Sequence, residues 1–177
     1  MNGNAHHITA CLGQTILGSQ VKMKTEAVNG MKILWDSGKR LKMKILICGG
    51  RNFSNYEYLM GAVDRYIKTS EEDFPDNEIE IVSGGARGAD TLAERYAKEK
   101  NLKLKVFPAD WNAHGKKAGI LRNEEMAHYL AVSADRCEVI AFWDGSSRGT
   151  ANMISTAKEF GLAFSIYYYQ ERKNEKR

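Results

Sequence analysis

Apolar and polar positions alternate in a regular way from Met43 onward. Ile45–Cys48 is an unbroken apolar run that ends in Gly49-Gly50, and the apolar positions between Tyr56 and Ile67 then recur at helical spacing. The same order of strand, turn and helix is repeated down the chain. It predicts strands over Ile45–Cys48, Ile79–Val82, Leu102–Phe107, Glu138–Trp143 and Ala163–Tyr169. Helices are expected after the first four strands: from Tyr56, from Ala89, over about Ile120–Ala131, and from Gly149-Thr150.

This alternation predicts an α/β fold, an open and mainly parallel five-stranded sheet with helices on both faces. Unbroken apolar runs such as Ile45–Cys48 and Val139–Phe142 are typical of strands buried on both faces. Leu102–Phe107 instead alternates with lysines, which indicates an edge. We therefore expect the strand order 3-2-1-4-5. The winding direction then reverses between the first and fourth strands, where open α/β sheets bind ligands beyond the carboxyl ends of the strands.

The character of the sequence changes at Met43, and this divides the chain into three parts. Residues 1–42 show no sustained period, and we expect a flexible N-terminal extension or sequence translated from an upstream start. An arm for a partner or for nucleic acid, or an added structural element, is the alternative. Residues 43–170 form the expected domain, and residues 171–177 a charged, solvated tail.

Charge is distributed unevenly between these parts. Lys and Arg number 26 and Asp and Glu 22, a formal net charge of +4. Residues 1–42 hold six basic and two acidic residues, so 20 of each remain from Met43 onward. A balanced domain argues against affinity of the whole surface for nucleic acid.

Hydropathy and cysteine usage indicate a cytoplasmic protein. The longest apolar runs are strand-sized, so no membrane span or membrane partner is expected. Ile8–Leu17 is mildly apolar but lacks the basic region and cleavage site of a signal peptide. The three cysteines have no metal-ligand spacing, and two lie in predicted strands, which favours reduced, buried thiols. The sequence predicts no metal site and no cofactor.

Three glycine-containing turns are the candidate ligand-binding segments. Glycine lets the backbone approach a ligand, and the first amides of a following helix attract an anion. Arginine side chains at such turns can bind phosphate. The alternative is that the glycines only make tight turns; neither a P-loop nor a GxGxxG pattern is present. The candidates are Gly49, Gly50 and Arg51; Ser83, Gly84, Gly85, Arg87 and Gly88; and Gly145, Arg148, Gly149 and Thr150.

These turns belong to a series of motifs that resembles a known family. The series is Gly49-Gly50-Arg51, Ser83–Asp90, Pro108-Ala109-Asp110-Trp111, Ala118-Gly119 with Arg122-Asn123 and Met126, and Arg148–Met153. In this order the motifs closely resemble the YspA-type (cpYpsA-related) branch of the SLOG superfamily, which groups the DprA-like and "lonely guy" domains. The resemblance spans about Lys44 to Ile166. It implies a Rossmann-like fold, a site for a nucleotide-related ligand, and an association with phages and mobile elements. The sequence does not give the oligomeric state, but enzymatic relatives in the superfamily often dimerise, so a homodimer is one option to test.

The resemblance also suggests catalytic candidates. The superfamily's phosphoribohydrolases cleave the N-glycosidic bond of a nucleoside monophosphate with an arginine and a glutamate. Arg122 looks equivalent to that arginine, with Asn123 in place of the usual lysine, but Met153 stands where the glutamate would be. Methionine cannot stabilise the positive charge that develops as the bond breaks. Asp90, Asp110 or Glu124 would have to supply a carboxylate.

The segment Pro108–Gly119 is predicted to be a loop that closes over a ligand. Asp110 and Trp111 are candidate ligand contacts, with Trp111 stacking on a base and Lys116 and Lys117 meeting phosphate. The alternative is a solvated loop with Trp111 packed in the core. Asp90, in the first turn of its helix, either complements the helix dipole or hydrogen-bonds a ribose or base.

Three functions follow from these observations. The first is a module that binds a nucleotide or nucleotide-derived ligand, for sensing or sequestering it in phage–host conflict. The second is a nucleotide-processing enzyme such as an N-glycosidic hydrolase. The third, single-stranded DNA binding of the DprA type, is disfavoured because the domain lacks a basic and aromatic stripe.

Overall fold

The computed structural model describes residues 41–73 and 78–170, and most of the expected extension and all of the expected tail lie outside them. Five strands and five α-helices follow one another in the chain, with one short 3-10 helix, η1. They are β1 (Lys42–Gly49), α1 (Tyr56–Asp73), β2 (Glu78–Ser83), α2 (Ala89–Glu99), β3 (Lys103–Val106), α3 (Trp111–His114), η1 (Gly115–Lys117), α4 (Ala118–Ser133), β4 (Arg136–Trp143), α5 (Arg148–Glu159) and β5 (Phe164–Tyr168).

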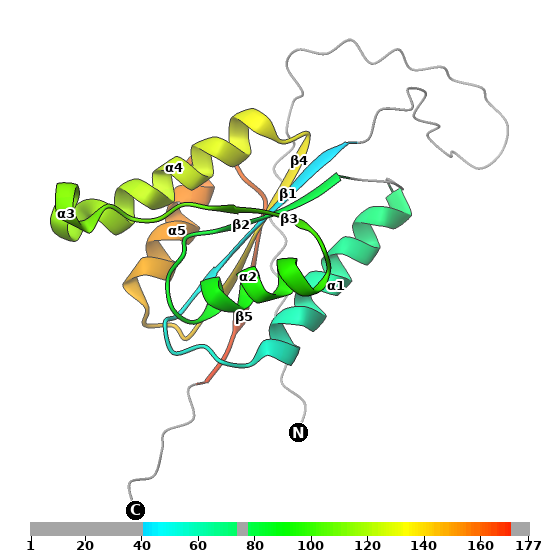
Figure 1. The fold of residues 1–177 in the computed structure, drawn as a ribbon, viewed down its shortest axis with the longest axis horizontal. Helices are drawn as coiled ribbons and strands as arrows, with labels where there is room; N and C mark the ends of the chain where they lie inside the picture. Colours follow the sequence, from blue (N-terminus) through cyan, green and yellow to red (C-terminus); the bar gives the residue numbers. More distant parts are fainter. Residues whose placement is uncertain (1–40, 74–77, 171–177) are drawn as a thin grey trace, which may run out of the picture.

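The strands form one parallel sheet in the order β3-β2-β1-β4-β5, which confirms the predicted fold class and strand order (Figure 1). Leu46 in the central strand pairs with Val82 of β2 on one side and Val139 of β4 on the other. Residues 43–48 and 137–142 are all buried, whereas the four residues of β3 are exposed. The unbroken and alternating apolar patterns thus report each strand's place in the sheet.

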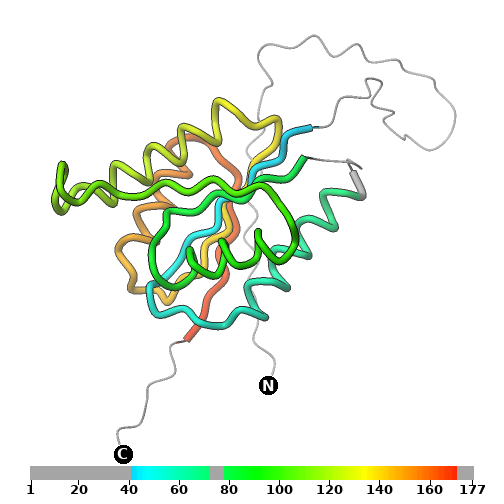
Figure 2. The backbone as a smooth tube through the Cα atoms, viewed as in Figure 1, coloured from blue at the N-terminus to red at the C-terminus, as the bar shows by residue number. Residues whose placement is uncertain are grey.

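Each face of the sheet carries its own core, because successive side chains of a strand point to opposite faces. Ile45 and Ile47 belong to the core cluster with α1 and α2. Leu46 and Cys48 belong to the cluster with α4 and α5. The tube in Figure 2 shows α1 and α2 on one side of the sheet and α4 and α5 on the other. Two covered faces leave the strand ends as the place for a ligand.

The segment Pro108–Gly119, expected to be a loop, contains the short helices α3 and η1. The Asp110 carboxylate starts α3 by accepting hydrogen bonds from the N–H groups of Asn112 (3.1 Å) and Ala113 (2.9 Å). Trp111 is 52% exposed, so it is not packed in the core. In Figure 1, α3 projects from the body of the domain at the start of α4. Among the described residues, no helix combines the length and apolar character needed to cross a bilayer.

Candidate functional site

A cleft of about 620 Å³, here called the main cleft, opens beyond the carboxyl ends of β1 and β4. This is the point where the strand order reverses, as the sequence predicted for a ligand site. The turns after β1 and β4, the first turn of α2, and the α3–α4 region supply its walls. They contribute Cys48, Gly49, Gly50, Arg51, Asn52, Ala86, Asp90, Trp111, Lys116, Gly119, Ile120, Arg122, Asn123, Asp144, Ser147, Arg148, Gly149, Thr150, Asn152 and Met153.

The turn after β1 is held closely against its neighbours, and this requires glycine. A Cβ on Gly49 would lie 2.5 Å from the carbonyl oxygen of Phe142, and Gly50 donates its N–H to that same oxygen at 3.1 Å. Gly88, at φ +88°, leaves no room for a Cβ next to the Gly50 carbonyl oxygen. The turn after β1 is therefore packed between the end of β4 and the turn after β2, which fixes the floor of the cleft.

Ser83 orders the turn after β2 from beneath. Its hydroxyl is buried, lies 3.0 Å from the Glu94 carboxylate to which it donates, and accepts the N–H of Gly85 at 3.1 Å. Ser83 lines neither cleft described here. Its role is to position the turn. Gly85, which is exposed, lies in this turn with φ +66°, a conformation that favours glycine.

Asp90 is a buried carboxyl group at the main cleft. One carboxylate oxygen accepts the N–H of Ala86 at 3.1 Å and lies 3.8 Å from Nη1 of Arg122. Burial raises the pKa of Asp90 to about 6, although the Ala86 N–H and the Arg122 charge both act to lower it. A carboxyl group with such a pKa can hold or release a proton near neutral pH.

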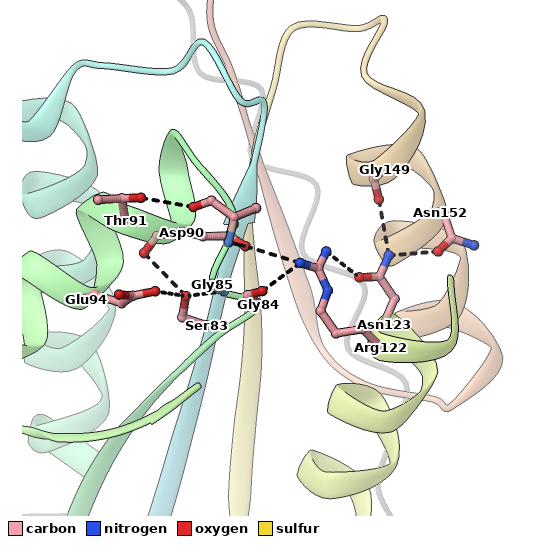
Figure 3. Close-up of polar contacts among 11 residues, drawn as sticks. Ser83, Gly84, Gly85, Asp90, Thr91, Glu94, Arg122, Asn123, Gly149 and Asn152 are labelled. Atoms are coloured by element: carbon pink, nitrogen blue, oxygen red, sulfur yellow. Dashed lines mark hydrogen bonds and ion pairs between the residues drawn. The ribbon is translucent and has the colours of Figure 1, made fainter. Parts of the chain in front are cut away.

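Arg122 connects three parts of the fold (Figure 3). Its Nη1 donates to the carbonyl oxygen of Gly84 at 2.7 Å and its Nη2 to Oδ1 of Asn123 at 3.2 Å. Its Nε is buried without a hydrogen-bond partner. The Asn123 amide then donates to Oδ1 of Asn152 (2.7 Å) and to the Gly149 carbonyl oxygen (3.3 Å). This network joins α4 to the turn after β2 and to the start of α5.

The turn after β4 presents an open helix N-terminus. The Asp144 carboxylate accepts the N–H groups of Ser146 (2.8 Å) and Ser147 (2.7 Å), and the Ser147 bond is the main cause of the lowered pKa of Asp144. Ser147 is the N-cap of α5 but makes no side-chain cap; Thr150 donates its hydroxyl to the Ser147 hydroxyl at 3.0 Å. The first turn of α5 therefore meets the cleft with uncapped amides.

A second cleft of about 630 Å³, here called the side cleft, lies beyond the carboxyl ends of β2 and β3. It is lined by Arg51, Gly84, Gly85, Ala86, Arg87, Pro108, Ala109, Trp111 and Arg122. Arg51, Ala86, Trp111 and Arg122 line both clefts.

The structure thus brings most sequence-predicted residues together and separates some of them. The main cleft gathers Gly49, Gly50, Arg51, Asp90, Trp111, Arg122, Asn123, Arg148, Gly149 and Thr150. Gly84, Gly85 and Arg87 line the side cleft. Lys116 also lines the main cleft. The candidates that line neither cleft are Ser83, Gly88, Asp110, Lys117, Glu124 and Gly145. Glu124 is exposed on α4, so the structure does not bring it to the site as an acid or base.

Three further residues of the main cleft had no role in the sequence analysis. Asn152 supports Asn123, and its position one helical turn after Gly149 was the available signal. Asp144 shapes the turn before α5. Cys48 is buried, and burial together with the Asp90 charge raises the pKa of its thiol, which makes it a poor nucleophile. The described residues contain no group of three or more His, Cys, Asp or Glu side chains suited to a metal ion.

Part of the chain is similar to a known protein family. Residues 43–114 match the model of the family described as YspA, cpYpsA-related SLOG. Over that segment the chain is similar to this SLOG family, the one that the sequence motifs resemble. The matched residues run from β1 to α3 and include the turns after β1 and β2 and Trp111. Arg122 and the start of α5 lie beyond them.

A phage protein provides a second point of comparison for this chain. The Gene 61 protein of Mycobacterium phage D29 is 42% identical over 87 residues, which cover 46% of this chain and 66% of that protein. The chain therefore spans slightly less than two thirds of that relative's length. The similarity supports the phage-associated context expected from the sequence.

Proposed function

We propose that the main cleft binds a nucleotide or a nucleotide-derived phosphorylated ligand, and that the domain senses or sequesters that ligand in a phage-associated setting. One observation carries the proposal: the uncapped N-terminus of α5, two exposed arginines and an exposed tryptophan line one cleft at the sheet's reversal point. Helix amides and arginines suit a phosphate group. An exposed tryptophan suits a base.

The charges of the main cleft support an anionic ligand. Arg51, Lys116 and Arg148 line it and are exposed. Its two carboxylates, Asp90 and Asp144, are both engaged by backbone N–H groups, and Asp90 also lies beside Arg122. The cations are therefore the groups that remain available to a ligand.

Isothermal titration calorimetry with the full chain tests this proposal. The panel comprises nucleoside monophosphates, pyrophosphate-linked dinucleotides and cyclic dinucleotides. The double variant Arg51→Ala/Arg148→Ala is expected to lower the affinity at least tenfold. Arg95→Ala, which removes an exposed arginine on α2 far from the clefts, is the matched control. Absence of binding across the panel would refute the proposal.

A second candidate function is a nucleotide-processing enzyme, such as an N-glycosidic hydrolase. The observation that favours it is the buried Asp90, with a pKa of about 6, at the cleft beside Arg122. Such a carboxyl group suits general acid–base chemistry. Incubation with nucleoside monophosphates, followed by chromatography, tests it: product should form with the parent chain and disappear with Asp90→Asn. If the Asp90→Asn and Arg122→Ala variants both still turn over the substrate, the catalytic residues lie elsewhere and the second candidate function at this site is wrong.

Two finer expectations complete the proposal. We infer a cytoplasmic location, which fits the burial of Cys48 and Cys137 in the core. Whether the chain forms a homodimer is tested by light scattering of the full chain. Single-stranded DNA binding is not proposed, because basic and acidic residues balance at 20 each from Met43 onward and the sequence shows no basic and aromatic stripe.

A further inference from the structure

The two clefts share a border, and Arg122 lies on it. Arg122 reaches from α4 to the Gly84 carbonyl oxygen after β2, so its guanidinium lies between the main cleft and the side cleft. In Figure 3 it lies between the Gly84–Asp90 side and the Asn123–Gly149 side. Arg51, from the turn after β1, lines both clefts as well. The border between the clefts therefore carries two arginines.

Arg122 retains hydrogen-bonding capacity at this border. A guanidinium has five N–H donors, and the structure assigns only one from Nη1 and one from Nη2. Its Nε is buried without a partner, and Asp90 at 3.8 Å is its ion-pair partner. Three donors therefore remain unused, one each on Nε, Nη1 and Nη2. A phosphate group above the border would meet the donors on Nη1 and Nη2 and a charge that a neighbouring carboxylate only partly offsets.

The side cleft has the features of a second half-site. Its volume of about 630 Å³ matches the 620 Å³ of the main cleft, and each lies within the range of about 300–1,000 Å³ that small-molecule sites occupy. Its walls include the turn Gly84-Gly85 and Arg87, and Trp111 forms a wall of both clefts. A mononucleotide in the main cleft would make no use of this second space.

We propose that the ligand is a dinucleotide whose two nucleosides are joined through phosphates, and that it lies across Arg122 with one nucleoside in each cleft. The linking phosphates face Arg51 and Arg122, one nucleoside lies over β1 and β4, and the other lies over β2 and β3. This inference rests on the proposed function, because it names the ligand class for the same site.

Calorimetry with the full chain tests it through two matched probe pairs. These are AMP with diadenosine pyrophosphate, and GMP with diguanosine pyrophosphate. In at least one pair, the dinucleotide is expected to bind with one-to-one stoichiometry and at least tenfold lower Kd than its mononucleotide.

Variants on each side separate the two half-sites. Ala109→Phe places a ring in the side cleft. Arg87→Ala removes the arginine that lines the side cleft but not the main cleft. Each should reduce the dinucleotide's advantage to less than threefold while the mononucleotide keeps its affinity. Gly149→Leu, at a position with open space for a side chain, fills the main cleft and should weaken both probes. Thermal unfolding establishes whether each variant is folded. If Ala109→Phe does not fold, Arg87→Ala alone tests whether the side cleft holds the second nucleoside.

The outcomes distinguish the two proposals. A mononucleotide that binds as tightly as its dinucleotide, or side-cleft variants that weaken both probes equally, would overturn the inference and leave the proposed function standing. If none of the four probes binds, the inference fails; the proposed function fails as well only if the wider nucleotide panel also shows no binding.

Discussion

Asp90 is a carboxyl group that the fold keeps from water, and this has a measurable cost in stability. Its pKa of about 6 in the folded protein exceeds the value of about 3.9 in an unfolded chain. Between these values the folded state binds more protons than the unfolded state, so the free energy of unfolding falls as pH rises from about 4 to 6. The difference in pKa corresponds to roughly 3 kcal/mol at most.

Replacing Asp90 with Asn should therefore stabilise the domain at pH 7.5. The neutral amide oxygen can still accept the Ala86 N–H, and we expect a gain of about 1–2 kcal/mol. Urea unfolding at pH 4.5 and 7.5 measures this gain. The free energy of unfolding of the parent should fall between the two pH values, and that of the variant should change much less. Glu124→Gln, which neutralises an exposed carboxylate on α4, is the control. Equal stability of parent and Asp90→Asn at pH 7.5 would contradict the assignment.

Gly84 determines where Arg122 lies. A Cβ there would fall 2.6 Å from the guanidinium carbon and 2.8 Å from an Asp90 carboxylate oxygen. Gly84→Ala should displace Arg122 and weaken nucleotide binding at least tenfold, measured by calorimetry. Gly61→Ala is the matched control, because nothing lies within 4 Å of its Cβ in the middle of α1. The control should bind normally and gain about 0.5–1 kcal/mol in stability. Unchanged binding by Gly84→Ala would show that Arg122 does not contact the ligand.

At the scale of elements, α3 holds an aromatic side chain outside the core. Trp111 is half exposed, and its indole ring lies beside the start of α4, where a Cβ on Gly119 would be in ordinary contact with it at 3.5 Å. Trp111→Ala should therefore cost less than about 1 kcal/mol of stability and weaken base-dependent binding by about 1–3 kcal/mol. Chemical unfolding and calorimetry measure the two effects. Trp111→Phe should restore most of the binding; a large loss of stability would instead indicate a packing role.

The strands could be predicted from the sequence because burial imposes a simple pattern on them. Ile45–Cys48 and Val139–Phe142 are apolar throughout because helices cover both faces, and this gave the sheet order and the reversal point. The helix α3 could not be predicted, since it spans four residues and begins with an Asp110 cap rather than an apolar period. Long strands and helices can be predicted because many apolar positions repeat along them, whereas a one-turn helix depends on a single capping side chain.

The candidate site was predictable only in part for a related reason. Glycine turns after strands must meet at one edge of a parallel sheet, so Gly49, Gly84 and Gly149 could be brought together from sequence. Which helix residues face the cleft depends on how each helix is rotated against the sheet. Asn123 is buried and hydrogen-bonds the partly exposed Asn152, whereas Glu124, one residue along α4, faces solvent.

At the scale of the whole molecule, the domain begins slightly before Met43. Leu41 accepts a hydrogen bond from the N–H of Glu78 (2.8 Å), and Lys42 exchanges two hydrogen bonds with Asp135 (2.9 and 3.0 Å). A chain that starts at Leu41 should match the full chain's Tm within about 2 °C. A chain that starts at Met43 loses these bonds and should unfold several degrees lower. Calorimetric scans of the three chains decide this; equal Tm values for the two truncations would show that the bonds contribute little.

The parallel direction of all five strands also has a practical consequence. The start of β1 lies at the end of the sheet opposite both clefts, whereas β5 finishes at the same end as the clefts, with the Tyr169 hydroxyl against Gly50 of the main cleft. A biosensor surface or reporter fused beyond residue 170 would therefore crowd the ligand entrance. Tethering the protein through the segment before β1 leaves that entrance facing the solution, and this is the orientation to choose when ligands are screened on an immobilised chain.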